Sequence, residues 1–166
     1  MSDKGAVPFL DGLRERPSRA RYDKVHLALE RKWRRRELKG DRMMKEVVDQ
    51  LWEHFAQSPY SWCGFYLLGP GGHELILGPH RDKPGLSPLP MSGSCGKAVQ
   101  TGKAVIVSNP GDPQRLSEIT VPVYDSAGVI WGVLDVGSLS AAAFDEMDQR
   151  WLEKILKPFQ EVGKAS

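Results

Sequence analysis

The sequence lacks the features that mark membrane proteins and secreted proteins. No apolar run approaches the ~20 residues that a membrane-spanning helix needs. The first residues do not show the charged-then-apolar pattern of a signal peptide, so we expect a cytoplasmic protein. Only two cysteines are present, Cys63 and Cys95, and they can form at most one disulfide bond rather than a disulfide framework.

Signals for a metal, a cofactor or a nucleic-acid partner are equally scarce. The four histidines stand on separate predicted elements without ligand spacing, so we expect neither a metal site nor a cofactor. Residues 1–40 carry a formal charge of +6, whereas residues 41–166 carry −4. A nucleic-acid-binding domain should carry its basic excess on the folded body. We therefore predict no nucleic-acid or membrane partner. We interpret the basic run 31–36 as a solvated helix face; contact of this run with nucleic acid or acidic lipid is the alternative.

The most informative stretch that is present runs from Ser117 to Ser138. It predicts a hairpin of two strands, 118–124 and 129–137, because β-branched residues alternate on both sides of a Gly-bearing turn. The alternation assigns Glu118, Trp131 and Asp135 to one face, and it assigns most of the aliphatic residues, Ile130 included, to the other.

The rest of the chain predicts an α+β sandwich with helices at both ends and antiparallel strands between them. We expect an N-terminal arm and a basic helix in residues 1–40, followed by one domain in residues 41–160, in which Asp145 caps a late helix. The helix near 19–39 carries a narrow apolar stripe on a charged surface, and we expect this stripe to be buried between the subunits of a homodimer. The stripe consists of Tyr22, Val25, Leu29 and Trp33.

Four side chains are predicted to meet on the loop-covered side of the sheet: Trp62, Tyr66, Glu118 and Asp135. Two carboxylates beside two aromatic rings are suited to a cation, because the acids form charge-assisted hydrogen bonds and the rings attract positive charge. Two ionised acids in a partly enclosed space repel one another, so an incoming ammonium would relieve that repulsion. Ordinary packing aromatics and solvated acids are the alternative interpretation.

The order of short motifs resembles a GAF domain, and most closely the free methionine-(R)-sulfoxide reductases. The resemblance covers roughly residues 43–156 and rests on SWCGFYLL, LGP, KP, LP, a Gly-Ser-Cys-Gly step, SEI-VPV, GVLD and FDE-D. It implies a six-stranded antiparallel sheet with helices on one face and a loop-covered pocket on the other. It also implies that Trp62 and Tyr66 enclose the substrate's sulfoxide methyl group, while Glu118 and Asp135 hold its amino group. A second aspartate of the family falls on Gly137.

The chemistry of that subfamily is poorly matched. Reduction of a sulfoxide needs an attacking thiolate and a resolving thiol. Of three cysteines that the resemblance implies, Cys95 is present, whereas the others fall on Leu86 and Gly111. Cys63 is predicted to face the core. Cys95 stands near a helix N-terminus, which can lower the pKa of a thiol, and a small buried residue is the alternative.

These patterns leave three hypotheses. The first is a non-catalytic GAF module with a sensory or regulatory role, which binds an ammonium-bearing metabolite such as an amino acid. The second is a divergent free methionine-(R)-sulfoxide reductase that acts through Cys95. The third is an interaction module whose pocket is filled by its own side chains.

Overall fold

The computed structural model describes residues 16–34, 37–56, 59–108 and 115–162. Its helices are α2 (Arg19–Trp33), α3 (Gly40–Phe55), α4 (Ser94–Thr101) and α5 (Glu146–Leu156), followed by the 3-10 helix η2 (Lys157–Glu161). Its strands are β1 (Tyr60–Leu68), β2 (Glu74–Arg81), β3 (Leu89–Pro90), β4 (Val105–Ser108), β5 (Ser117–Tyr124) and β6 (Ile130–Ser138). The six strands form one antiparallel sheet in the order β3-β2-β1-β6-β5-β4.

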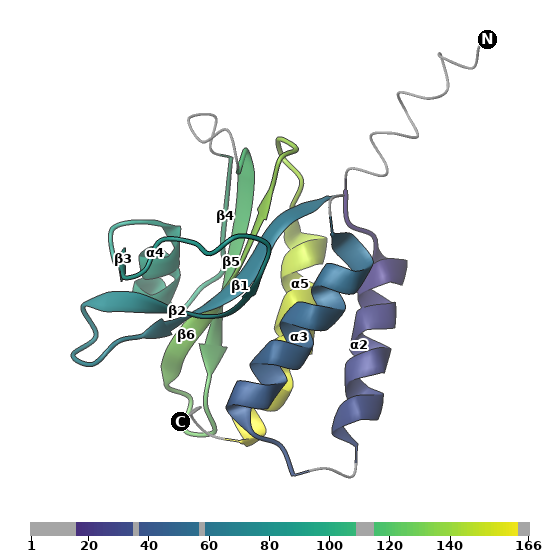
Figure 1. Ribbon diagram of the computed structural model, residues 1–166, viewed down its shortest axis with the longest axis horizontal. Coiled ribbons are helices and arrows are strands. Elements are labelled where there is room, and N and C mark those ends of the chain that lie inside the picture. Colours follow the sequence, from purple (N-terminus) through teal and green to yellow (C-terminus); the bar gives the residue numbers. More distant parts are fainter. Residues whose placement is uncertain (1–15, 35–36, 57–58, 109–114, 163–166) are drawn as a thin grey trace.

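The sheet separates two different layers. Helices α2, α3 and α5 gather on one side of it, whereas α4 lies on the other (Figure 1). This arrangement confirms the predicted α+β sandwich, including the six-stranded antiparallel sheet that the resemblance implied.

The predicted hairpin is confirmed as β5 and β6, within one residue at each end. Its turn is closed by Asp125, whose side-chain oxygen accepts hydrogen bonds from the backbone N–H groups of Ala127 and Val129. Gly128 follows in this turn with a φ of 79°, a conformation that favours glycine. The register places Glu118 opposite Gly137 and Thr120 opposite Asp135, which sets the positions of the polar side chains discussed below.

The apolar stripe of α2 is buried within its own chain, which corrects our expectation of a subunit interface. Tyr22 and Val25 are fully buried and Leu29 is nearly so, because α2 packs on α3 and α5. Trp33, at the end of the helix, donates a hydrogen bond from Nε1 to Glu46 and contacts the ring of Phe159 edge-on. A second copy of the chain therefore cannot use this stripe, and the predicted homodimer loses its physical basis there.

A small network of buried hydrogen bonds connects α2 and α5 to the sheet. The Tyr22 hydroxyl donates to Asp148 Oδ1 over 2.6 Å and lies 2.9 Å from the Tyr60 hydroxyl. The other Asp148 oxygen accepts from the backbone N–H of Asp145, whose own side chain caps α5 as predicted. A buried polar atom without a partner costs about 1–3 kcal/mol. These hydrogen bonds give each buried hydroxyl and carboxylate oxygen a partner, which explains how tyrosine and aspartate are tolerated in the core.

One assignment to the sheet faces was wrong. Trp131 was predicted on the loop side, yet its ring is buried on the helix side, with its centroid 5.9 Å from that of Phe159. The pairing slips at the end of the hairpin, where Val123 is opposite Gly132 and Tyr124 is opposite Ile130. Such a bulge reverses the alternation of side chains. Ile130, predicted on the helix side, accordingly lies close to Gly102 at the end of α4.

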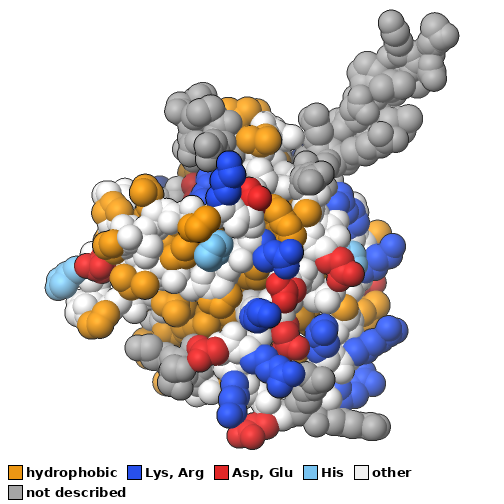
Figure 2. Space-filling view, viewed as in Figure 1, with side chains coloured by type: hydrophobic (Ala, Val, Ile, Leu, Met, Phe, Trp, Pro, Cys, Tyr) orange, Lys and Arg blue, Asp and Glu red, His pale blue; other side chains and the backbone are white. Residues whose placement is uncertain are grey.

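The outer surface of the helices is mixed in charge. Acidic and basic side chains lie next to each other over the helices on the face shown in Figure 2. Arg31, Lys32 and Arg34 are exposed at the C-terminal end of α2, where positive charge suits the helix dipole. No helix in the described ranges is long and apolar enough to cross a membrane.

Candidate functional site

Two aromatic rings from β1 form the first part of the candidate site. Trp62 and Tyr66 are four residues apart on a strand, so both point to the loop side, with ring centroids 5.9 Å apart. Trp62 Nε1 donates to the carbonyl of Lys83 over 2.6 Å, and the Tyr66 hydroxyl donates to the carbonyl of Leu86 over 2.9 Å. The polar ends of the rings thus hold the proline-rich segment between β2 and β3 over the sheet.

The Trp62 ring also packs against a histidine of the neighbouring strand. His80 of β2 lies parallel to it, with centroids 6.1 Å apart. Gly64 between Trp62 and Tyr66 is needed for this arrangement, because a Cβ there would lie 2.5 Å from the Trp62 ring and 2.6 Å from His80 Cβ. The position of Trp62 is therefore fixed by its neighbours.

The two acids come from the central hairpin and differ in exposure. Asp135 is 1% exposed, and its Oδ1 accepts a 2.8 Å hydrogen bond from the Thr120 hydroxyl directly opposite on β5. Glu118, at the start of β5, is partly exposed. The structure therefore brings together all four side chains that the sequence predicted to meet.

A fifth side chain, which the sequence analysis missed, lies between them. Arg115 donates from Nη1 to Asp135 Oδ2 over 2.8 Å, and the same nitrogen is 3.9 Å from Glu118 Oε2. Its guanidinium carbon stands 4.4 Å from the centre of the Trp62 ring. We call Trp62, Glu118 and Asp135 the cation box. The expectation of two acids left without a positive partner was wrong, since Arg115 supplies one.

The cation box opens into a cavity of about 710 Å³ on the loop side of the sheet. Besides the box, its wall includes Tyr66, Leu86, Cys95 and Arg115. This volume is in the range of small-molecule pockets in proteins. The cavity thus joins an aromatic wall and a charged end, which is the combination expected for a small ligand with one polar group.

Cys95 lies in this cavity but does not have the setting of a reactive thiol. It is 3% exposed at the start of α4. Burial, followed by the charges of Asp135 and Glu118, raises the pKa of the Cys95 thiol well above its usual range, and these effects exceed those of Thr120 and Arg115, which lower it. Of the two interpretations drawn from the sequence, this setting therefore favours the small buried residue over the activated thiol.

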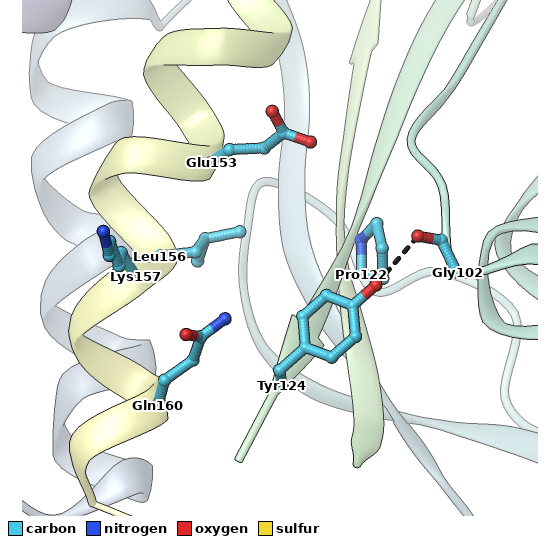
Figure 3. Close-up of a pocket in the computed structure, with 7 residues that line it drawn as sticks. All are labelled: Gly102, Pro122, Tyr124, Glu153, Leu156, Lys157 and Gln160. Atoms are coloured by element: carbon cyan, nitrogen blue, oxygen red, sulfur yellow. Dashed lines mark hydrogen bonds between the residues drawn. The ribbon is translucent and has the colours of Figure 1, made fainter. Parts of the chain in front are cut away.

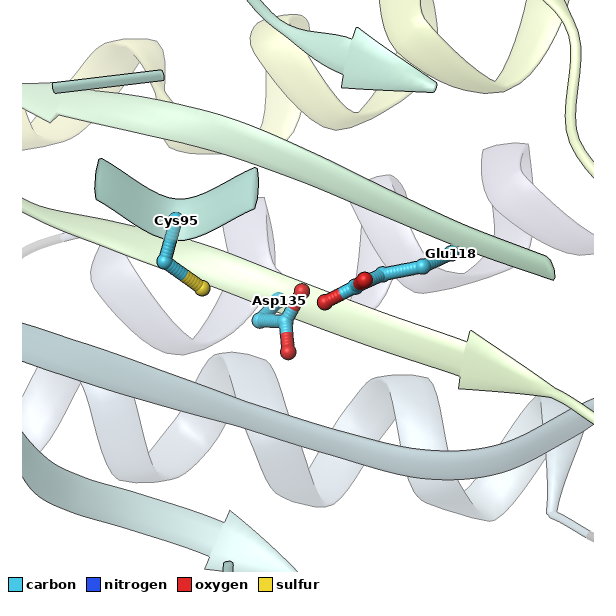
Figure 4. Close-up of side chains that lie close together, drawn as sticks. All are labelled: Cys95, Glu118 and Asp135. Carbon is cyan, nitrogen blue, oxygen red and sulfur yellow. The ribbon is translucent and has the colours of Figure 1, made fainter. Parts of the chain in front are cut away.

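Cys95, Glu118 and Asp135 converge from three different elements, as Figure 4 shows. One ligand atom from each lies within 4.8 Å of the other two, a spacing that a metal ion could bridge. Both Asp135 oxygens, however, already accept hydrogen bonds from Thr120 and Arg115. Because a guanidinium already supplies positive charge to this cluster, we assign no metal to it.

A second, smaller cavity of about 250 Å³ lies between β5 and the segment formed by α5 and η2 (Figure 3). Tyr124 stands in its wall and donates from its hydroxyl to the Gly102 carbonyl over 2.8 Å. Glu153 and Lys157 reach it from the helical segment. No cluster of aromatic and charged groups comparable to the cation box is found among its lining residues.

Comparisons with known proteins decide the family. The family model described as "GAF domain" matches residues 41–158. The chain belongs to the GAF domain family. The GAF resemblance stated from the sequence motifs is thereby confirmed.

The relatives of this GAF protein include both enzymes and proteins named only for the domain. The free methionine-R-sulfoxide reductase of Saccharomyces cerevisiae is 35% identical over 107 residues, which are 58% of this chain and 59% of that protein. GAF domain-containing protein A of Dictyostelium discoideum is 36% identical over 61% of this chain and 68% of its own length. The reduced form of fRMsr of Staphylococcus aureus superimposes with a TM-score of 0.76 at 27% identity, over 88% of this chain and 96% of the other. The match thus spans less than two thirds of the yeast enzyme's length, and it leaves the choice between the two classes to the site itself.

Proposed function

We propose that this GAF protein is a non-catalytic binding module with a sensory or regulatory role, whose cavity takes a small ammonium-bearing metabolite such as an amino acid. One observation carries the proposal: the cation box already holds one cation, the Arg115 guanidinium, against the Trp62 ring and the Asp135 carboxylate. The box combines a ring face with a buried carboxylate, and both attract positive charge. We propose Trp62, Tyr66, Glu118 and Asp135 as the ligand-binding residues.

The preference for a cation follows from the charges around the cavity. Among the described residues that line the cavity, the three acids Asp82, Glu118 and Asp135 outnumber the two bases Lys83 and Arg115, so the lining carries a net negative formal charge. An ammonium can form charge-assisted hydrogen bonds there, each contributing about 1.5–3 kcal/mol. An anion such as a nucleotide phosphate would meet the same acids unfavourably.

The positions and the raised pKa values of the two thiols argue against catalysis of sulfoxide reduction. Cys63 is fully buried on the helix side of the sheet, while Cys95 faces the loop side, so the sheet separates them. Burial raises the pKa of both thiols. Of the two positions where the resemblance implies further cysteines, Leu86 lines the cavity and carries no thiol, and Gly111 lies outside the described residues. No pair of thiols in the sequence is thus positioned to attack and then resolve a sulfenic acid.

Thermal-shift measurements test the binding proposal. We expect amino acids and simple amines to raise the unfolding temperature saturably, whereas nucleotides at equal concentration do not. A ligand at 100 times its dissociation constant adds ~2.7 kcal/mol to the free energy of unfolding. Asp135→Asn should weaken the response, and the matched variant Asp49→Asn, which alters an exposed acid paired with Arg81, should leave it unchanged. Stabilisation by nucleotides alone would refute the proposal.

The second candidate is a divergent free methionine-(R)-sulfoxide reductase, favoured by the yeast relative and by the position of Cys95 in the cavity. In a thiol-coupled assay on free methionine-(R)-sulfoxide we expect turnover to be absent or marginal. A robust rate that Cys95→Ser abolishes would select the enzyme instead.

A further inference from the structure

We propose that Arg115 is the built-in occupant of the cation box, and that it decides which external ligands can bind there. This inference rests on the proposed function, since it names the residue with which an incoming ammonium competes. Its guanidinium contacts two of the three side chains of the box, with a hydrogen bond of 2.8 Å to Asp135 and a ring contact of 4.4 Å to Trp62. An external cation that uses the same two groups cannot enter while Arg115 is seated.

The sheet provides space for this occupant at one position. Gly137 of β6 stands opposite Glu118, and the aliphatic part of Arg115 lies against it. A Cβ at Gly137 would lie 2.9 Å from both Cγ and Cδ of Arg115, closer than side-chain atoms pack. The glycine thus leaves room for the stem of the arginine, while Asp135 and Trp62 hold its head.

The seated state is favourable but not deeply enclosed. The Arg115 side chain keeps 21% of its surface exposed, whereas that of Asp135 keeps 1%. Arg115 can therefore move its head toward water, but Asp135 cannot. The apparent affinity for an external cation is the intrinsic affinity reduced by the fraction of molecules in which Arg115 has left the box. A cation with high intrinsic affinity for the box competes best with Arg115. A ligand that also carries an anionic group competes well too, because that group can pair with the guanidinium after it has left the box.

Chemical rescue with methylguanidinium tests the inference. Arg115→Ala removes the occupant and leaves the box, so methylguanidinium should bind it saturably in calorimetric titration at low salt. We expect the wild type to bind the same probe about tenfold more weakly or worse, because the tethered guanidinium competes. Arg150→Ala is the matched control, since it deletes an arginine that pairs with Glu146 on the exposed side of α5, and it should behave as the wild type does.

Gly137→Ala provides a second test that keeps every group of the box. The added methyl group disfavours the seated stem of Arg115, so methylguanidinium should bind this variant more tightly than it binds the wild type. If Arg115→Ala is too unstable to titrate, the affinities of Gly137→Ala and Arg115→Gln for methylguanidinium test the inference in its place. Equal affinity of the wild type and these variants for the probe, or no binding by any of them, would overturn the inference.

The two proposals fail in different ways. If the wild type binds an amine and substitution of Arg115 leaves that affinity unchanged, the role of Arg115 is refuted while the proposed function stands. If the Arg115 variants bind methylguanidinium tightly but no amino acid or amine binds any form of the protein, the proposed function fails while the occupant role stands.

Discussion

The two sides of the sheet are built from the same strands but differ in what covers them: a closed core on the helix side and a cavity on the loop side. Neighbouring residues of β1 divide between them: Cys63 and Phe65 enter the helix-side core, while Trp62 and Tyr66 face the cavity. On the helix side, the hydroxyl of Tyr22 and the carboxylate of Asp148 satisfy each other. On the loop side, the acids meet a guanidinium at the edge of an open cavity.

This difference teaches where binding can occur. A polar group whose partners are all buried contributes to the fold, and exchanging one of them for an external ligand would disrupt the packing. The salt bridge between Arg115 and Asp135 lies at the border of a cavity. An external cation can therefore replace the guanidinium with little disturbance of the core. The loop side is therefore the side on which to look for a ligand, and the following predictions probe the contrast.

The largest difference is expected between a core ring and a side chain of the cavity wall. Phe55 is fully buried, with its ring 4.6 Å from that of Tyr60 and 4.7 Å from that of Tyr22. Phe55→Ala should lower the free energy of unfolding by about 3–5 kcal/mol. Leu86→Ala should change it by less than about 0.5 kcal/mol, because Leu86 is 75% exposed. Urea denaturation of both variants checks this, and similar losses would contradict the division into a structural side and a binding side.

The next effect is a pH dependence that originates on the helix side. Burial raises the pKa of Asp148 from 3.8 to about 6, despite the hydrogen bond from Tyr22. Between these values the folded protein holds a proton that the unfolded chain has released, so stability falls as the pH rises through this window. The loss should approach roughly 3 kcal/mol, since each unit of pKa shift corresponds to about 1.36 kcal/mol.

Asp148→Asn provides the comparison for this prediction. Because asparagine does not titrate, the difference in unfolding free energy between wild type and variant should shrink or change sign from pH 4 to pH 7. Denaturation of both proteins at several pH values measures it. Parallel curves across this range would show that Asp148 does not titrate there.

The sequence predicted much of this architecture because its strongest signals are local. The alternation in β5 and β6 predicted the hairpin and assigned Glu118 and Asp135 to the same face, and both line the cavity on that face. The stripe of α2 was recognised correctly as apolar, but periodicity cannot say what covers a helix face. Tyr22 was therefore assigned to a second subunit, whereas it meets Asp148, 126 positions away in the same chain.

The errors at the candidate site have the same origin. Trp131 was misplaced because a bulge in the pairing leaves no mark in the alternation. Arg115 was missed because it lies just before β5, where the alternation of the strand does not yet indicate a direction for its side chain. The space for Arg115 depends on the register of the hairpin, which places Gly137 opposite Glu118 and which the alternation alone does not give. The homodimer and the cytoplasmic location stay predictions.

The smallest effect is expected at the two cysteines, which face opposite sides of the sheet and yet should behave alike. Cys63 is fully buried and Cys95 is 3% exposed. Burial raises the pKa of each thiol, so each supplies less thiolate, the nucleophilic form, than an exposed cysteine does at the same pH. We expect a disulfide reagent to label the native protein far more slowly than the unfolded chain, and Cys95→Ser to leave the native rate nearly unchanged. One rapidly labelled thiol that disappears in Cys95→Ser, but persists in Cys63→Ser, would show that the cavity activates Cys95 after all. That result would move this GAF protein from the binding modules toward the reductases, because the first requirement of sulfoxide reduction is a reactive thiolate beside the bound ligand.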